Sequence, residues 1–384
     1  MRPIYLDYNA TTPIDPVVVE AIEPFLHEHF GNPSSLHVYG QTAHAALERA
    51  RAQVAALLGA RPSEIVFTSG GTEATNHALT GLVLPALATR AAPPPHIVTS
   101  TVEHPATAVT CAFLGRLGCR VTRVPVDGRG VIDLTALERA LRRPTTVVTV
   151  MHANNEVGTL EPIRAIADLA HARGALVHTD AAQSAGKIPV DVDALGVDLL
   201  SLAGHKLYAP KGVGALYVRT GISLEPLIHG AGHEAGRRAG TENVPYLVGL
   251  GAACELARRS LPAASGALRQ LRDRLWQRLR DGLGDDVVLN GHPEARLPNT
   301  LNVNVLGHVG AELLAAVPEI AASTGSACHE GRVELSPVLL AMGVPEEVGR
   351  GAIRLSVGRF TTEAEVDRVG ALLVDAARSL SRTV

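Results

Sequence analysis

Short apolar segments alternate with helix-like stretches along most of the chain, and this alternation constrains its fold more than any other feature. The apolar segments read IVFTS, HIVTS, CRVTRVPV, TTVVTVMHA, ALVHTD, VDLLSLAG and GALYVR, with stretches such as IRAIADLAHARG between many of them. Strand-length apolar segments that alternate with helices are typical of a mainly parallel sheet sandwiched by helices. The sequence therefore predicts an α/β fold.

Composition and charge narrow the functional classes. The 384 residues are 46% hydrophobic but only 3% aromatic, so the chain can fill two packed units with largely aliphatic cores. A net charge of −3 offers no electrostatic footprint for nucleic acid or an anionic membrane. The four cysteines show no metal-ligand or disulfide spacing, and the sequence shows neither a membrane-spanning apolar run nor a signal-peptide pattern. We expect a soluble, cytoplasmic protein with no metal, nucleic-acid or membrane partner.

Lys206 follows His205 in a small-residue turn between two apolar runs, within LLSLAGHKLYAPKGVGALYV. An amine at its ordinary pKa of ~10.4 is a poor nucleophile, and burial between apolar strands would lower that pKa. Lys206 is therefore a candidate Schiff-base residue. Taken alone, it and Lys211 are more simply explained as solvated loop lysines, because lysine is seldom buried.

Two further motifs follow predicted strands. Asp180 ends the strand ALVHTD, and Gln183 lies three residues later. A carboxylate there could pair with the pyridine nitrogen of pyridoxal phosphate, or it could simply cap a helix. The segment 69–72 (SGGT) comes between the strand IVFTS and a helix-competent run. Its backbone N–H groups could bind one phosphate, although a glycine turn capped by Thr72 explains the segment equally well.

Three side chains complete the set of candidates. His104 follows the strand HIVTS and could stack on a flat cofactor, or it could be an ordinary loop histidine. Cys328 lies among small and polar residues in AASTGSACHE, a loop-like setting for an exposed nucleophile, whereas the other three cysteines have apolar or helical neighbours. Arg354 lies in a strand-like alternation, where it could clamp a carboxylate or form a structural ion pair.

The order and spacing of these motifs resemble one family nearly end to end: the class V aminotransferase-like, fold-type I pyridoxal-phosphate enzymes of the cysteine desulfurase and selenocysteine lyase group. The segments that carry the resemblance are YLDYNATTP, FGNPSSLH, TSGGTEATN, HANNEVGT, HTDAAQS, GHKLYAPKGVGALYVR, AGTENVP, LPNTLNV and GSAC. The resemblance implies pyridoxal 5'-phosphate as the cofactor and a mainly parallel, seven-stranded sheet. The segment SLPAASG at 260–266 predicts an interruption after a long helix that begins near Val244, and hence a boundary between a large domain over residues 14–260 and a smaller α+β domain over 261–384 that carries Cys328 and Arg354. The resemblance implies that residues 1–13 belong to the smaller domain.

The resemblance implies a role for each candidate residue. Lys206 would hold the cofactor's aldehyde as a Schiff base, Cys328 would accept the sulfur, and His104 would stack on the ring. We further hypothesise that His104 takes the proton of the substrate thiol. The implied cofactor-binding residues also include Gly71, Thr72, Asp180, Gln183, His205 and Thr241, and the implied substrate-binding residues are Asn32, Asn155 and Arg354. Because Thr241 would reach in from a second subunit, a homodimer is implied.

The sequence thus predicts a cysteine desulfurase that converts L-cysteine into L-alanine, leaves a persulfide on Cys328 and passes the sulfur to an unidentified acceptor protein. Selenocysteine lyase, which releases selenide, is the alternative, because Ala203 stands where many desulfurases have a phosphate-binding serine. An aminotransferase or epimerase on the same fold is a further alternative, but such an enzyme would have no use for the Cys328 thiol. A non-catalytic scaffold for a sulfur-carrier protein would have no use for the cofactor residues.

Overall fold

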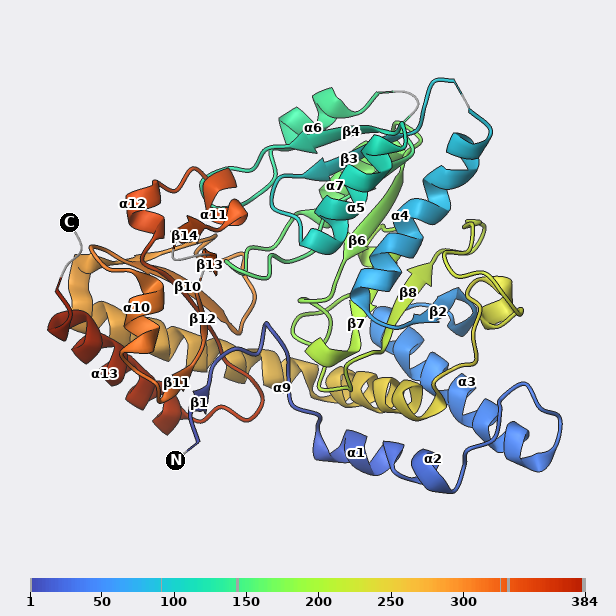
Figure 1. Ribbon diagram of the computed structural model, residues 1–384, viewed down its shortest axis with the longest axis horizontal. Coiled ribbons are helices and arrows are strands. Elements are labelled where there is room, and N and C mark those ends of the chain that lie inside the picture. Colours follow the sequence, from blue (N-terminus) through green and yellow to red (C-terminus); the bar gives the residue numbers. More distant parts are fainter. Residues whose placement is uncertain (1, 91, 143–144, 325, 330–331, 382–384) are drawn as a thin grey trace.

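The structure, a computed structural model, describes residues 2–90, 92–142, 145–324, 326–329 and 332–381, with the backbone alone for 326–329 and 332–334. A large helix-covered sheet lies on one side of the molecule and a smaller group of strands lies on the other, with the long helix α9 (Val244–Leu283) running beneath both (Figure 1). Within these ranges, no helix is long and apolar enough to cross a bilayer.

The large sheet has seven strands in the order β2-β8-β7-β6-β5-β3-β4. Each of the seven apolar segments of the sequence forms one of these strands. Strand β8 is antiparallel to both of its neighbours, and the other pairs run parallel. The predicted mainly parallel, seven-stranded sheet is confirmed. The strands are β2 (Ile65–Thr68), β3 (His96–Ser100), β4 (Arg120–Val124), β5 (Val147–Thr149), β6 (Leu176–Asp180), β7 (Leu199–Ala203) and β8 (Gly214–Val218).

Helices cover both faces of this sheet because successive strand residues point to opposite faces. Val98 packs in the core under α3 (Val38–Leu58), α7 (Ile163–His171) and the first half of α9. Its neighbour Ile97 packs on the opposite side with Leu79 and Leu114, under α4 (Gly71–Ala88) and α5 (Pro105–Arg116). The remaining helices up to α9 are α1 (Pro16–Ile22), α2 (Pro24–His27), α6 (Leu134–Ala140) and α8 (Val192–Leu195).

Helix α9 corrects one expectation. The segment 260–266 was expected to interrupt the helical pattern, but α9 continues through it for 40 residues with Pro262 inside. A proline inside a helix costs about 3 kcal/mol. The helix continues because it is anchored on both sides of Pro262, by Leu250 in the core of the large sheet and by Leu275 in the core of the smaller unit. The division into two domains at residue 260 stays a prediction.

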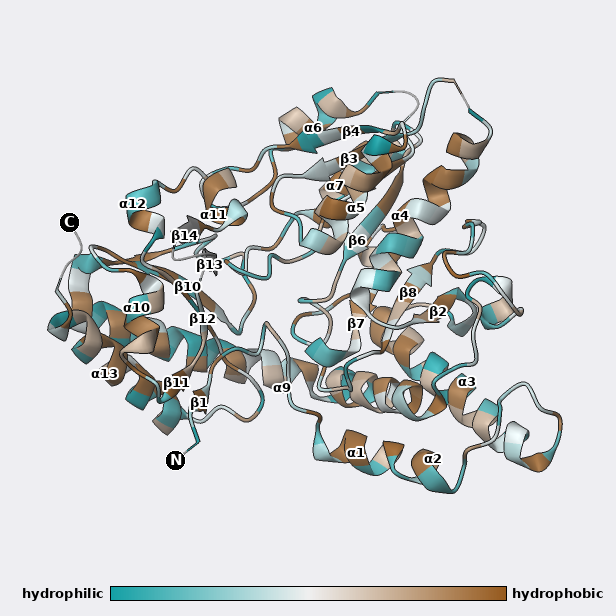
Figure 2. Ribbon diagram, viewed as in Figure 1, coloured by the Kyte–Doolittle hydropathy of each residue, from teal (hydrophilic) through white to brown (hydrophobic). Residues whose placement is uncertain are grey.

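The smaller unit combines the C-terminal elements with the start of the chain. Strand β1 (Ile4–Tyr5) pairs in parallel with β11 (Ile320–Ala321), so the N-terminal segment packs there as expected. Helix α13 (Glu363–Ser379) alternates apolar and polar residues (Figure 2), and its apolar side chains pack in the core of this unit. Its four-stranded sheet has the order β12-β15-β10-β9, formed by β12 (Ser323–Thr324), β15 (Ala352–Ser356), β10 (Thr300–Val305) and β9 (Val287–Leu289). Three short helices, α10 (Gly310–Ala315), α11 (Pro337–Ala341) and α12 (Glu346–Gly349), complete it.

The segment around Cys328 is a second correction. The sequence suggested a loop, but the backbone of Cys328 lies in β13 (Ser326–His329), opposite Val333 of β14 (Arg332–Leu335). Strand pairing is made by backbone groups, so a segment of small residues can form a strand without the apolar alternation that signals one in a sequence.

Candidate active site

A cavity of about 370 Å3 opens where the strands of the large sheet end. Strands β2, β3, β5, β6 and β7 all point their carboxyl ends to this edge, where ligands bind in open α/β sheets. The residues that follow these strands line the cavity together with Asn9 and with Arg354 from β15. The lining includes Gly71, Thr72, His104, Asn155, Asp180, Gln183, Ala203, His205, Lys206 and Arg354.

The cavity therefore brings together most of the residues that the sequence singled out, but Asn32 and Thr241 lie elsewhere. Asn32 is exposed, and its side-chain oxygen accepts a hydrogen bond from the Ser34 backbone N–H at 2.9 Å. Thr241 is exposed at a separate cavity of about 210 Å3, which it shares with Ser69. The side chain of Cys328 lies outside the described part of the chain. The individual roles of all these residues stay predictions.

The Lys206 side chain is held against the loop that precedes α1. Its Nζ donates to the backbone carbonyls of Asn9 and Ala10, the latter at 2.8 Å. Burial, reinforced by the positive charge of Arg354, lowers the pKa of Lys206 to about 8. The amine can therefore lose its proton near neutral pH, which a nucleophilic lysine requires.

Asp180 and His104 both line the cavity, and the charge of each affects the pKa of the other. Burial raises the pKa of Asp180, whose Oδ1 accepts from the Ala182 backbone N–H at 2.9 Å. No helix follows at 181–185, so the interpretation of Asp180 as a helix cap was wrong. Burial lowers the pKa of His104, and its Nδ1 accepts from the Ala106 backbone N–H at 3.1 Å. The neutral ring therefore carries its proton on Nε2.

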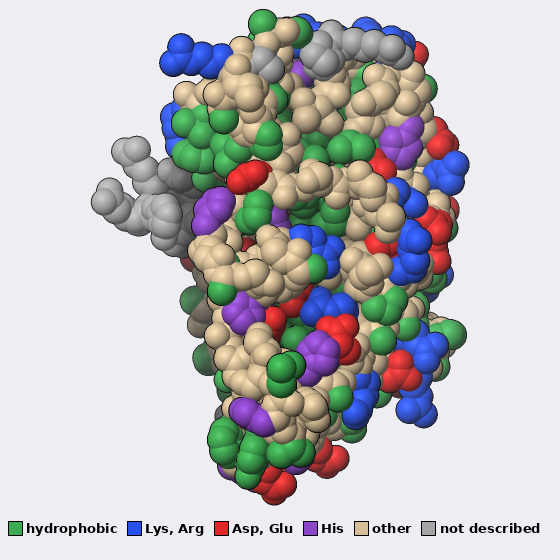
Figure 3. All heavy atoms as spheres, turned by 90° about the vertical axis from the view of Figure 1, so that its right-hand side faces the viewer, with side chains coloured by type: hydrophobic (Ala, Val, Ile, Leu, Met, Phe, Trp, Pro, Cys, Tyr) green, Lys and Arg blue, Asp and Glu red, His purple; other side chains and the backbone are tan. Residues whose placement is uncertain are grey.

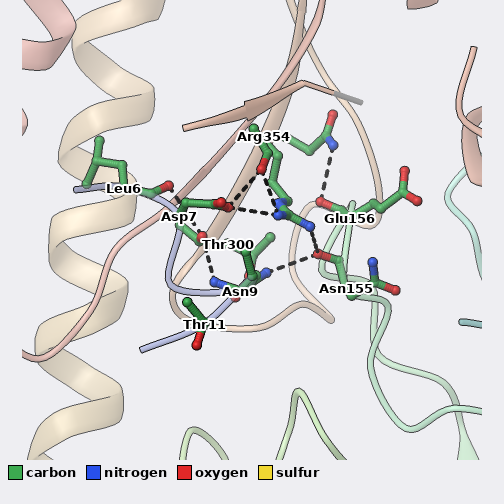
Figure 4. A network of polar contacts seen from close by, with 12 residues as sticks. Leu6, Asp7, Asn9, Thr11, Asn155, Glu156, Thr300 and Arg354 are labelled. Carbon is green, nitrogen blue, oxygen red and sulfur yellow. Dashed lines mark hydrogen bonds and ion pairs between the residues drawn. The ribbon is translucent and has the colours of Figure 1, made fainter. Parts of the chain in front are cut away.

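Arg354 is fixed by three neighbours (Figure 4). Its Nη2 donates to Asp7 at 2.8 Å and to the Ser323 hydroxyl at 3.1 Å, and its Nη1 donates to the Asn155 carbonyl at 3.1 Å. The buried Nε–H has no hydrogen-bond partner within the described ranges. The structure thus contains the ion pair that was one interpretation of Arg354. Arg354 also lines the cavity, where a guanidinium can bind a carboxylate.

The residues at the start of α4 and after β7 suit a phosphate group. Gly70 has a φ of 154°, which favours glycine, and none of the side chains that the structure describes caps the first turn of α4. Backbone N–H groups at such an open helix start bind anions. Burial and the nearby Lys206 lower the pKa of His205 to about 4, so its ring is neutral at physiological pH. With an amine at Lys206 and a carboxylate at Asp180, these groups fit pyridoxal 5'-phosphate.

The sequence also carried functional signals that were missed. Asn9 and Asp7 lie in YLDYNATTP, a segment that supported the family resemblance but received no role. The Asn9 carbonyl accepts from both Lys206 and the Gln183 side-chain amide, and Asp7 holds Arg354. Glu103, adjacent to His104, is buried and accepts from Ser100 and the Met151 N–H, and burial raises its pKa to about 8. The signal in the sequence would have been the presence of polar residues, such as Asp7 and Asn9, within a motif that carries the family resemblance.

A larger cavity, of about 900 Å3, contains none of the predicted cofactor residues. It is lined by α3 and by residues 232–242, with Glu48, Arg51, Arg237 and Glu242 among its charged groups. Acidic, basic and histidine side chains lie close together on this side of the molecule (Figure 3). The described residues that line the larger cavity include no lysine for a Schiff base, so the smaller cavity is the candidate active site.

The helix-covered sheet, with a lysine, an acid and an arginine at one cavity, defines an α/β enzyme of the fold-type I class. The family model for aminotransferase class-V matches residues 4–369, and the chain belongs to this family.

Known relatives agree with this assignment. The chain is 50% identical over 373 residues to a cysteine desulfurase of Gluconacetobacter diazotrophicus, covering 96% of this chain and 92% of the relative. A solved structure of a NifS-like protein matches with a TM-score of 0.91 and 39% identity, covering 98% of this chain and 100% of that one. A structure of SspA in complex with cysteine matches with a TM-score of 0.82 and 37% identity, over 93% and 99% of the two chains. The predicted kinship with cysteine desulfurases is confirmed.

Proposed function

We propose that the protein is a pyridoxal-phosphate-dependent cysteine desulfurase, which converts L-cysteine into L-alanine and keeps the sulfur as a persulfide on Cys328. The observation that carries the proposal is the meeting of Lys206, Asp180 and Arg354 at one cavity. The 50% identity to a named cysteine desulfurase supports the choice of substrate. The structural similarity to SspA, which was solved in complex with cysteine, also supports this choice.

Each group at the cavity has a task in this reaction. When bound, pyridoxal phosphate supplies an electron sink for negative charge at the substrate's α-carbon. Asp180 would hold the pyridine nitrogen, Gln183 the ring oxygen, and Gly71, Thr72 and His205 the phosphate. Lys206 would hold the cofactor's aldehyde until the substrate amine displaces it, and its freed amine would then move the α-proton.

Arg354 and Asn155 would orient the substrate carboxylate, which places the substrate's sulfur for attack. The Cys328 thiolate would form a new S–S bond while the substrate's C–S bond breaks. The electron pair of that bond stays on carbon, which takes up protons to become alanine, and the transferred sulfur remains on Cys328 as a persulfide.

His104 is the proposed proton acceptor for the substrate thiol. The Nδ1 of its ring already accepts from the Ala106 N–H, so taking up a proton there would break that bond. Stacking of the ring on the cofactor would leave this hydrogen bond intact. If His104→Gln keeps full desulfurase turnover with cofactor retained, the proton-accepting role is wrong.

The reaction is tested by its products. Purified protein supplied with pyridoxal phosphate should release alanine from cysteine, and Lys206→Ala should abolish this. Cys328→Ala should stop persulfide formation and cysteine turnover. Retained selenocysteine turnover in Cys328→Ala would show that the scaffold also serves as a selenocysteine lyase. A keto-acid product would instead support an aminotransferase.

We further propose a cytoplasmic homodimer in which Thr241 and Asn32 of one subunit complete the site of the other, and which passes its persulfide to an acceptor protein. The exposure of both residues away from the cavity of their own chain supports this arrangement. Mixing Lys206→Ala with Thr241→Ala chains tests it. If Thr241 serves the partner's site, one intact site forms in each mixed dimer, and activity recovers to about a quarter of wild type. No recovery would place Thr241 in its own chain's site.

A further inference from the structure

Lys187 is a buried lysine for which the proposed reaction has no use. Of the 35 basic residues in the chain, 32 are arginines and three are lysines, namely Lys187, Lys206 and Lys211. Lys211 is exposed, and Lys206 lies at the cavity. Lys187 is only 7% exposed and does not line the cavity. A buried lysine needs a hydrogen-bond partner, because burying an unpaired amine is costly.

Both acceptors that the structure gives Lys187 belong to Gln183. Its Nζ donates to the Gln183 backbone carbonyl at 3.0 Å and to the side-chain Oε1 at 3.1 Å. The turn between the two residues brings them together: Gly186 has a φ of 73°, and a Cβ there would lie 2.3 Å from Leu207. Gly186 therefore allows the chain to fold back so that the Lys187 amine reaches Gln183.

The contact with Lys187 determines which way the Gln183 amide faces. An amine donates to the oxygen of an amide, so Oε1 points to Lys187 and Nε2 points away. Nε2 donates to the Asn9 carbonyl at 2.9 Å, the same carbonyl that accepts from Lys206. The second Nε2–H is left to donate to a ligand in the cavity, which Gln183 lines.

We propose that Lys187 is a positioning residue that fixes the Gln183 side chain with its N–H groups toward Asn9 and the cofactor's ring oxygen. The inference rests on the proposed function for the identity of the cofactor. Burial, reinforced by Lys206, lowers the pKa of Lys187 to about 7. Both the ammonium and the neutral amine have at least two N–H groups, so both acceptors on Gln183 stay satisfied in either state.

The experiment compares Lys187→Met, Gln183→Leu and the double variant in the holoenzyme. The readouts are the dissociation constant of pyridoxal phosphate and the pH midpoint of its absorption band. Lys187→Met should weaken cofactor binding about tenfold and shift the midpoint, as expected for loss of one hydrogen bond to a charged group. In the Gln183→Leu background the same change should matter less than about twofold, because Lys187 acts through Gln183. Lys211→Met, an exposed lysine given the same substitution, should match wild type.

A purely structural Lys187 would weaken binding equally in both backgrounds, and that result would overturn the proposal. A crystal structure of cofactor-free Lys187→Met gives an independent readout. We expect the Gln183 side chain to leave the Asn9 carbonyl, and an unmoved side chain would also overturn the proposal. If wild-type protein fails to bind pyridoxal phosphate, the proposed function is wrong, and the cofactor-free structure still decides the role of Lys187.

Discussion

The lowered pKa of Lys206 gives a prediction that can be worked out from the structure. Burial and the charge of Arg354 bring this pKa from 10.5 to about 8. A lowered lysine pKa means that the neutral, nucleophilic amine forms above about 8 instead of above 10.5. At pH ~7.5, roughly a quarter of the side chains would be neutral instead of about 0.1%, which is about 200 times more nucleophile.

The low lysine content of the chain allows this pKa to be measured directly. Cofactor-free protein labelled with 13C at the lysine ε-carbons should give three signals, and Lys206→Ala identifies the one of interest. Its titration midpoint should lie near 8. The rate at which pyridoxal phosphate attaches should rise with pH through the same midpoint.

The variant Arg354→Met tests whether the charge of Arg354 contributes to the lowered pKa of Lys206. It removes a positive charge that lowers the pKa of Lys206 and frees Asp7, whose negative charge raises it. Both effects move the midpoint upward. A wild-type midpoint above 10, or one that stays unchanged in Arg354→Met, would refute the electrostatic account.

Two further variants test binding and stability. Arg354→Gln should raise the KM for cysteine about 10- to 100-fold and lower kcat less, because it removes charge-assisted bonds to the carboxylate; a change in kcat alone would contradict this. Glu234→Gln should destabilise the protein by about 1.5–3 kcal/mol in chemical denaturation, since it replaces the buried charged pair with Arg51 by a neutral contact, while Arg51 keeps its ion pair with Glu48 at 3.1 Å. The side chains of Arg51 and Glu234 form a bidentate pair at 2.7 and 2.8 Å and are only 9% and 2% exposed. The matched control Asp168→Asn breaks an exposed pair with Arg164, and we expect a loss below about 1 kcal/mol.

The large sheet could be predicted from the sequence because each of its strands is an apolar segment bounded by polar or glycine-rich turns. Asp180 and Lys206 could be located for the same reason, since Asp180 ends one such strand and Lys206 lies three residues after the end of another. Parallel strands end at one edge of a sheet, so their positions along the chain also placed them near one another.

The parts that sequence patterns missed depend on contacts between distant segments. Asp7 and Arg354 are 347 residues apart, and their ion pair forms only because the N-terminal segment packs against β15. The continuity of α9 past Pro262 likewise depends on two separate cores that hold its two halves. Neither contact leaves a periodic signal in the residues themselves.

The three lysines show what composition can add to motif reading. A guanidinium stays charged under all physiological conditions, whereas an amine can lose its proton when it is buried. In a chain with 32 arginines, a buried lysine therefore indicates a position that needs a group able to lose its proton, or one small enough to fit beside closely spaced acceptors. Arg354 fits the opposite demand, a permanent planar charge for a carboxylate. Lys206, which contacts the Asn9 carbonyl at the cavity, can supply proton-dependent chemistry, whereas Lys187 places a compact amine against both acceptors of Gln183.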